Sequence, residues 1–337
     1  MLTNAIHRMS DIEKLKNGEK IYPHFVDFHT SDVCNHNCLG CAYRGRHSGT
    51  MLDLKRHAQA IDILMDHGVK AFDFAGGGEA TMMPYLPDLM QKISMRGGYF
   101  GLITNGSPFT MDLADAMLDK GTYLRVSLEA SSPWLFARYK GMSPLNFNRI
   151  VDKTKEIVKE RNARKSELEI SLKFSVSKTL RGIQHYQMMF MLADSIGVDR
   201  VSIKPLRHEP EELTEQERYA EYALLQKARP TGHKYKIIES LLPTPAEKIP
   251  QCWLNPLHVV MDQNGDLYIC CYYYYRDNDF KIGNIFEQKF EDIWLSDLHR
   301  QKIANIKKTS CAMVDCKFFN HHEAVVTSGK RGQVYFL

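Results

Sequence analysis

The sequence lacks any long apolar segment. In its 337 residues, no uncharged apolar run approaches the length that a transmembrane helix needs. The first twenty residues mix His7, Asp11, Glu13 and Lys16 with scattered apolar residues, and they contain no apolar core of a secretory signal. We therefore expect a cytoplasmic protein without a membrane partner.

The chain also lacks a strong charge of either sign. Its formal net charge is +4, and its lysines and arginines are spread along the whole sequence. A nucleic-acid partner would call for a concentrated basic surface, so we expect none, whereas a modest positive balance suits an anionic small substrate. Hydrophobic residues make up 44% of the chain, which is enough for a core and excludes wholesale disorder.

Cysteine is absent between residues 41 and 252. The eight cysteines fall into two groups, within residues 34–41 and within residues 252–316. Disulfide frameworks belong to small secreted domains, whereas such groups in a cytosolic chain are typical of metal ligands.

The first group has the spacing C-x3-C-x2-C, formed by Cys34, Cys38 and Cys41. A tight loop of this kind can direct three sulfurs to one face of an iron–sulfur cube, and the chain offers no fourth nearby thiolate to close the site. One iron would then stay open for small-molecule chemistry. The alternatives are a zinc site, for which only His36 lies inside the loop, and three unrelated buried thiols.

Apolar and β-branched runs alternate with helical patterns from about residue 22 to residue 207. Helices are expected to begin after Thr110 and after the Ser143-Pro144 break, and to stop at Gly121 and Gly197. The expected strands are residues 25–28, 70–75, 99–104, 123–128, 168–176 and 198–203. This alternation predicts an α/β fold with parallel strands, and six units are too few for a closed eight-stranded barrel.

The cysteine loop after the first expected strand resembles that of the radical S-adenosylmethionine (radical SAM) family. The resemblance implies a partial (β/α)6 TIM-like barrel and a [4Fe–4S] cluster held by Cys34, Cys38 and Cys41. Its open iron would bind the amino and carboxyl groups of SAM. Reduction by a flavodoxin- or ferredoxin-type electron donor would then cleave SAM to methionine and a 5′-deoxyadenosyl radical. The family usually carries a large apolar residue before the third cysteine, where this chain has Gly40, and Tyr43 is a candidate for the missing ring.

Further residues that resemble the family's SAM contacts follow the next strands. Gly77, Gly78 and Glu79 form a GGE motif after the second strand, although a glycine triplet by itself equally favours a plain turn. The remaining candidates are Asn105 and Ser127 at strand ends, Arg138 in the segment after the fourth strand, and, for SAM or substrate, Lys173 and Ser175 on the fifth strand. Simple turns and salt bridges at a barrel rim are the alternatives for these residues.

The second cysteine group surrounds a predicted hairpin. Asn264-Gly265 between two apolar stretches is a hairpin signal, and the hairpin would bring Cys252 and Cys270 toward each other. With Cys311 and Cys316 these thiolates could close a full [4Fe–4S] shell, and zinc is the alternative metal.

This arrangement resembles the Twitch/SPASM extension of radical SAM enzymes, which carries auxiliary clusters. The C-terminal group has five cysteines, so the shorter Twitch form with one auxiliary [4Fe–4S] cluster fits better than a full SPASM domain. Cys271 is then surplus. It is either a packing thiol or, as in epimerases of this architecture, a catalytic hydrogen-atom donor to a substrate radical.

The expected organisation is an N-terminal extension (1–21), the barrel (22–229), a proline-containing linker (230–250) and a small α+β iron–sulfur domain (251–337). The resemblance implies hydrogen abstraction from a small polar substrate of the amino sugar or sugar nucleotide class. Dehydrogenation, or redox-neutral epimerisation or decarboxylation, would follow. Two alternatives stay open: a peptide-modifying radical SAM maturase, and a non-catalytic iron–sulfur or zinc scaffold.

Overall fold

The computed structural model describes residues 9–45, 48–206, 210–242, 252–271 and 280–306. The chain divides into two compact units. The barrel unit comprises residues 28–58 and 72–242, and the terminal unit comprises residues 1–27, 59–71 and 243–337. No helix within the described residues has both the length and the hydropathy of a membrane span.

Parallel strands form the centre of the barrel unit. The unit begins at Phe28, the last residue of the first strand. In sheet order the strands are β1 (Phe25–Phe28), β2 (Ala71–Phe74), β3 (Tyr99–Thr104), β4 (Tyr123–Glu129), β5 (Glu169–Val176), β6 (Arg200–Pro205) and β7 (Lys236–Glu239). All pairings from β3 to β7 are parallel. Parallel pairing brings the carboxyl ends of the strands to one edge, where the loops can share a site.

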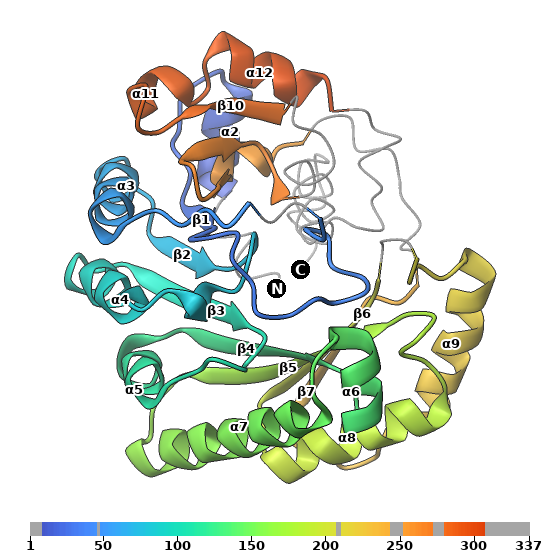
Figure 1. Ribbon diagram of the computed structural model, residues 1–337. Coiled ribbons are helices and arrows are strands. Elements are labelled where there is room, and N and C mark those ends of the chain that lie inside the picture. The colour runs from blue at the N-terminus through green and yellow to red at the C-terminus, as the bar shows by residue number, and fades with distance from the viewer. Residues whose placement is uncertain (1–8, 46–47, 207–209, 243–251, 272–279, 307–337) are drawn as a thin grey trace, which may run out of the picture. The chain divides into compact units, whose positions relative to one another are not determined.

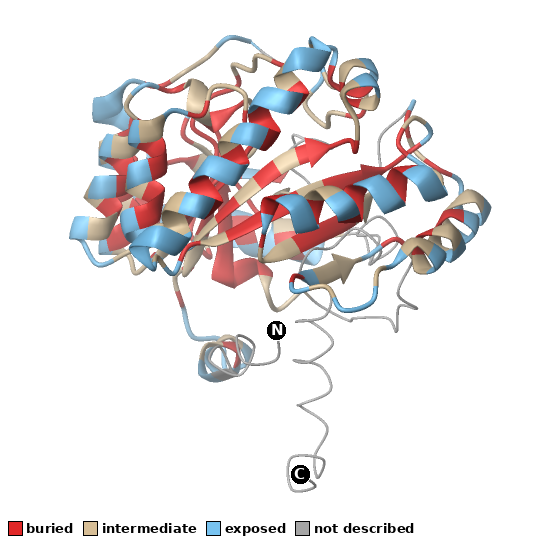
Figure 2. Ribbon diagram, turned by 90° about the horizontal axis from the view of Figure 1, so that it is seen from below, coloured by how far each residue is buried: buried red, intermediate tan, exposed pale blue. Residues whose placement is uncertain are grey.

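The helices of the barrel unit follow these strands in the chain. They are α3 (Leu54–Asp66), which passes into the terminal unit at residue 59, η1 (Ala80–Met82), α4 (Leu86–Met95), α5 (Met111–Lys120), α6 (Pro133–Lys140), α7 (Pro144–Arg164), α8 (Ile183–Ile196) and α9 (Glu215–Ala228). Helices α4, α5, α7 and α8 lie along the outer side of the strands (Figure 1). Their buried faces pack on the strands and their exposed faces turn outward (Figure 2).

Local signals in the sequence account for the ends of these helices. Thr110 begins α5 by accepting a hydrogen bond from the backbone N–H of Leu113 at 3.3 Å, and Ser143 begins α7 in the same way. Gly121 follows the last residue of α5, and Gly197 follows the last residue of α8. These expected boundaries are confirmed.

All six expected strands are present within two residues of their expected bounds, so the predicted α/β partial barrel is confirmed. A seventh strand, β7, was not predicted. It lies within residues 230–250, where composition favours a linker, and it pairs in parallel with β6. Its four residues are exposed or only half-buried, so they carry little of the apolar signal by which the other strands were found.

The terminal unit combines short helices with antiparallel strands. Its elements are α2 (Met9–Lys16), η2 (Asn255–Leu257), β8 (His258–Met261), β9 (Asp266–Tyr268), β10 (Lys281–Asn284), α11 (Phe290–Ile293) and α12 (Asp297–Ala304). The strand order is β10-β9-β8. The predicted hairpin is confirmed: Gly265 has a φ of +84°, and the Asp262 carboxylate accepts hydrogen bonds from the N–H groups of Asn264 and Asp266 at 2.8 and 2.9 Å.

Candidate functional site

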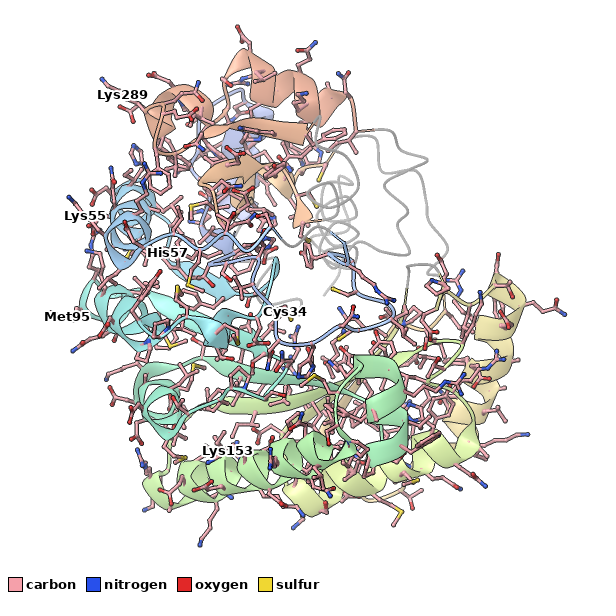
Figure 3. All side chains as sticks on the ribbon, viewed as in Figure 1. Cys34, Lys55, His57, Met95, Lys153 and Lys289 are labelled. Atoms are coloured by element: carbon pink, nitrogen blue, oxygen red, sulfur yellow. The ribbon has the colours of Figure 1, made fainter. Side chains whose placement is uncertain are left out.

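The three cysteines of the first group lie in one irregular loop that follows β1. Cys34, Cys38 and Cys41 are half-buried free thiols, and Cys34 lies near the ends of the barrel strands (Figure 3). Two backbone N–H groups point at the sulfurs: His36 N lies 3.5 Å from Cys34 Sγ, and Tyr43 N lies 3.4 Å from Cys41 Sγ. Donors of this kind favour thiolates over thiols.

The thiols of the loop lie near enough for each charge to affect the pKa of the others. Burial raises the pKa of Cys34 to about 11, and the charges of Glu79, Cys38 and Cys41 raise it further. Burial also raises the pKa of Cys41, which the N–H of Tyr43 opposes and the Cys38 thiolate reinforces. If the three thiols ionised without a cation nearby, the thiolates would repel each other. The loop therefore fits a cationic group.

A [4Fe–4S] cluster meets this requirement. Each cysteine of such a site binds a different iron, so its ligands need not converge on one point as zinc ligands do. Within the described ranges, no three His, Cys, Asp or Glu side chains are arranged around one ion position.

The glycine loop after β2 packs its backbone directly against the start of the cysteine loop. Gly78 N donates to Ser31 O at 2.7 Å, and Glu79 N donates to Val33 O at 2.8 Å. A Cβ atom on Gly78 would lie 2.0 Å from the same Val33 oxygen, so only glycine permits this approach. Gly77, beside it, is buried. The GGE motif is therefore fixed in position by the residues that precede Cys34.

Glu79 is 5% exposed, and its carboxylate is held by η1 and by the end of β3. Oε1 accepts hydrogen bonds from Thr104 Oγ1 at 2.6 Å and from Thr81 Oγ1 at 2.7 Å. Oε2 accepts one from Asn105 N at 2.6 Å. Because a carboxylate oxygen has two lone pairs, Oε2 keeps an acceptor position for a further donor such as an amine.

Asn105 connects β3 to the cysteine loop. Its Nδ2 donates to Asn35 Oδ1 at 2.7 Å, and its Oδ1 accepts from Ser107 N at 2.9 Å. Ser107 Oγ in turn lies 2.7 Å from Nε2 of His36. Burial first, and then the charge of Lys140, lower the pKa of His36 to about 3, so this imidazole is neutral. Asn105 therefore acts here as a support for the loop.

Glu129, which sequence reasoning missed, is the centre of a second polar cluster. It is buried at the end of β4 and has a φ of +67°, a strained value for a residue with a side chain. Lys173 Nζ donates to its Oε1 at 2.7 Å, and Ser175 Oγ donates to its Oε2. Burial opposes ionisation, but Lys173 and Lys140 together hold the pKa of Glu129 below its usual value.

The other candidates near β4 are distributed differently. Lys173 and Ser175 are both engaged with Glu129, and the carbonyl oxygen of Ser127 accepts a hydrogen bond from Lys140 Nζ at 2.8 Å. Arg138 is exposed on the last turn of α6, whereas Lys140 is 3% exposed. The spacing of the buried residues Phe136, Tyr139 and Lys140 is the sequence signal that identifies the inner face of α6.

The space above Gly40 is filled by two side chains. A Cβ atom on Gly40 would lie 2.7 Å from Leu206 Cδ1 and 3.1 Å from the hydroxyl oxygen of Tyr139. Leu206 and Tyr139 thus occupy the position that a large residue at 40 would need. Tyr43, the other candidate for this ring, lies edge-on to His29 with 5.9 Å between the ring centroids.

The described cysteines of the terminal unit are Cys252, Cys270 and Cys271, and all three are half-buried. The side chain of Asn255 donates to the carbonyl oxygen of Ile269, which joins the segment after Cys252 to the residue before Cys270. Cys311 and Cys316 lie outside the described residues.

Comparisons with known proteins match both parts of the chain. The radical SAM superfamily model matches residues 28–170, and the SPASM iron–sulfur cluster-binding domain model matches residues 252–317. A curated relative is the S-adenosylmethionine-dependent nucleotide dehydratase of Flammeovirga pacifica, 28% identical over 107 residues, which are 30% of this chain and 36% of that protein. The match thus spans about a third of that relative's length.

Two solved structures share the fold. Streptococcus suis SuiB bound to S-adenosylmethionine has a TM-score of 0.69 at 16% identity, covering 91% of this chain and 74% of that chain. The structure of anSMEcpe with bound AdoMet has a TM-score of 0.65 at 14% identity, covering 89% of this chain and 88% of that chain.

Replacing Gly78 with alanine is expected to prevent the cysteine loop from loading iron. The added Cβ would meet the Val33 backbone oxygen, which no rotamer change can relieve. Gly78→Ala should therefore lose most of the loop's iron after anaerobic reconstitution and melt at a lower temperature. Gly97→Ala, which strains the backbone at a φ of +71° but has open space around its Cβ, is the control and should keep its iron. Parent-like iron in Gly78→Ala would contradict this account.

Replacing Glu129 with glutamine should destabilise the protein at neutral pH by about 2 kcal/mol, because Lys173 loses its charged partner. The folded-state pKa of Glu129 lies below its ordinary value of 4.5, so its contribution is present above that pH and is lost as the pH falls further. Urea unfolding should show the difference between parent and variant shrinking below about pH 4.5. Exposed Glu167→Gln is the control, and a difference independent of pH would refute the assignment.

Proposed function

Because this chain belongs to the radical SAM superfamily and carries a SPASM-like iron–sulfur domain, we propose that Cys34, Cys38 and Cys41 hold the cluster that binds and reductively cleaves SAM. When bound, the cluster and SAM supply an electron and a 5′-deoxyadenosyl radical that abstracts hydrogen. The observation that carries the assignment is the direct connection of the cysteine loop to Glu79 through Asn105. The two features that the chemistry needs, an open cluster and a carboxylate for an amine, are thereby joined.

The residues around the cluster loop divide the work of binding SAM. Glu79 Oε2 accepts a hydrogen bond from the amino group of SAM. The glycine backbone at residues 77 and 78 allows SAM to approach closely. Ser127 and Arg138, at the end of β4 and on α6, stay candidates for the SAM carboxylate or ribose. Tyr139 and Leu206 cover the position above Gly40 and exclude water there.

We propose a small polar substrate, of the sugar nucleotide or amino sugar class, as the acceptor of the radical. Two observations support this proposal: the curated relative is named a nucleotide dehydratase, and two lysines, Lys140 at the end of α6 and Lys173 on β5, act on the one buried carboxylate of Glu129. An excess of positive charge suits a phosphate. The second candidate is a peptide substrate, because SuiB, which shares this fold at a TM-score of 0.66, has been solved with its precursor peptide SuiA.

Anaerobic reconstitution of the full chain tests the cluster assignment. About eight iron atoms per chain are expected, for two four-iron clusters, and 5′-deoxyadenosine should form from SAM under a low-potential reductant. Cys34→Ala, Cys38→Ala and Cys41→Ala should each lose SAM cleavage and about four iron atoms. Zinc in place of iron, without SAM cleavage, would show the scaffold alternative to be the right one. Stimulation of 5′-deoxyadenosine release by nucleotide sugars, amino sugars or peptides then separates the substrate classes.

Cys271 distinguishes epimerisation from dehydrogenation. If its thiol returns a hydrogen atom to the substrate radical, Cys271→Ala should still release 5′-deoxyadenosine but form no inverted product. In deuterium oxide the parent enzyme should then place one deuterium at the inverted carbon. If the variant keeps full product formation, Cys271 is a packing thiol, and oxidation through the auxiliary cluster becomes the favoured outcome.

A further inference from the structure

The last turn of α6 is fixed to the cysteine loop by the backbone. Leu39 N donates to Tyr139 O at 2.9 Å, and Asn37 N donates to Lys140 O at 3.1 Å. Gly141, which ends the helix at a φ of +66°, would bring a Cβ atom to 3.3 Å from Asn37 O. These contacts fall between Cys34 and Cys41, so the side chains of this helix end are held in register with the thiolates.

Lys140 is a buried cation that local carboxylates do not neutralise. It is 3% exposed, and its Nζ donates to a neutral acceptor, the carbonyl oxygen of Ser127. Lys140 acts on the carboxylate of Glu129, which Lys173 and Ser175 already contact. Glu129, Lys173 and Lys140 together leave one positive charge in excess. Burying an ammonium group is costly unless negative charge lies nearby.

The cysteine loop supplies that negative charge. The field of Lys140 lowers the pKa of Cys41, against the larger effect of burial, and it contributes to the low pKa of His36. His36 is neutral and adds no charge of its own. The hydroxyl oxygen of Tyr139 lies 3.1 Å from the Cβ position of Gly40. Burial first, and then the charges of Glu129, Cys38 and Cys41, raise the pKa of Tyr139.

We propose that Lys140, assisted by the hydroxyl of Tyr139, raises the reduction potential of the cluster held by Cys34, Cys38 and Cys41. One electron from a flavodoxin- or ferredoxin-type donor enters the cluster, and its charge becomes one unit more negative; no bond or proton changes. A fixed positive charge stabilises the reduced form more than the oxidised form, and hydrogen bonds to sulfur act in the same direction. Lys140 thus acts on the cluster through its fixed positive charge and not by direct contact with substrate. This inference rests on the proposed cluster ligands.

The test is a redox titration of the reconstituted full chain, followed by the electron paramagnetic resonance of the reduced cluster. The signal that changes on adding SAM identifies the SAM-binding cluster and separates it from an auxiliary one. Lys140→Gln keeps a hydrogen-bond donor for Ser127 O but removes the charge. At a fixed potential its ratio of reduced to oxidised cluster should fall about tenfold, which is about 59 mV for one electron. Tyr139→Phe should shift the ratio in the same direction by less.

Two further variants make the result specific. Lys153→Gln removes a half-buried lysine on α7 that pairs with Glu156 and lies away from Cys34 (Figure 3), so it should leave the potential unchanged. Glu129→Gln removes the opposing negative charge and should shift the ratio the other way, toward the reduced form. A shift of opposite sign in Glu129→Gln tests whether these fixed charges set the reduction potential, even if Lys140→Gln does not load its cluster.

The proposal is overturned if Lys140→Gln, with parent iron content, titrates like the parent. It is also overturned if Glu129→Gln leaves the potential unchanged or lowers it. Failure of the underlying ligand assignment is distinguishable, because the SAM-sensitive signal would then persist in Cys34→Ala.

Discussion

The close approach of the glycine loop to the residues before Cys34 is the constraint on which the rest of the site depends. Gly78 N donates to Ser31 O at 2.7 Å and Glu79 N donates to Val33 O at 2.8 Å, so close that a Cβ atom on Gly78 would meet the Val33 oxygen. Glu79 follows directly, so the position of its carboxylate is set by this contact. From there the connection continues through Asn105 to Asn35, inside the cysteine loop. The ends of β1, β2 and β3 are thus tied together because parallel strands bring them to the same edge.

Charge is the second organising factor of the barrel unit. The cysteine loop gathers thiols whose ionisation burial opposes, and Glu79 adds a further negative charge close to Cys34. Lys140 opposes this charge from one side. Glu129 has a left-handed backbone conformation at the end of β4. The hydrogen bonds from Lys173 and Ser175 to its carboxylate hold it there. The left-handed Glu129 and the buried Glu79 both follow or end strands, which is where an α/β fold places its ligands.

The solved relatives show how far fold and function separate. SuiB shares this arrangement over 91% of the chain at only 16% identity, and a structure of SuiB contains a peptide. The curated relative that matches 30% of the chain is named for a nucleotide reaction. Function depends on particular side chains placed on a common scaffold. The charged residues Glu129, Lys140 and Lys173 are therefore a better guide to the substrate than the barrel itself.

The local pattern of the sequence was sufficient for the six expected strands, the helix ends at Thr110 and Gly197, and the hairpin at Gly265. Each depends on residues close in the chain: apolar periodicity, a capping hydroxyl, or a glycine with positive φ. The spacing of Cys34, Cys38 and Cys41 also belongs to this class, because a loop of eight residues limits where its sulfurs can point. Strand β7 escaped prediction because half-exposed residues carry a weak apolar signal.

The sequence by itself therefore determined the alternation of strands and helices, and it indicated an iron–sulfur loop at the end of the first strand. Only the tertiary structure decided which charged groups face that loop. It buries Lys140 and leaves Arg138 exposed two residues earlier, and it engages Lys173 and Ser175 with Glu129, 44 and 46 positions away. The reason is physical: a group's burial and partners arise from long-range packing, which no local pattern encodes.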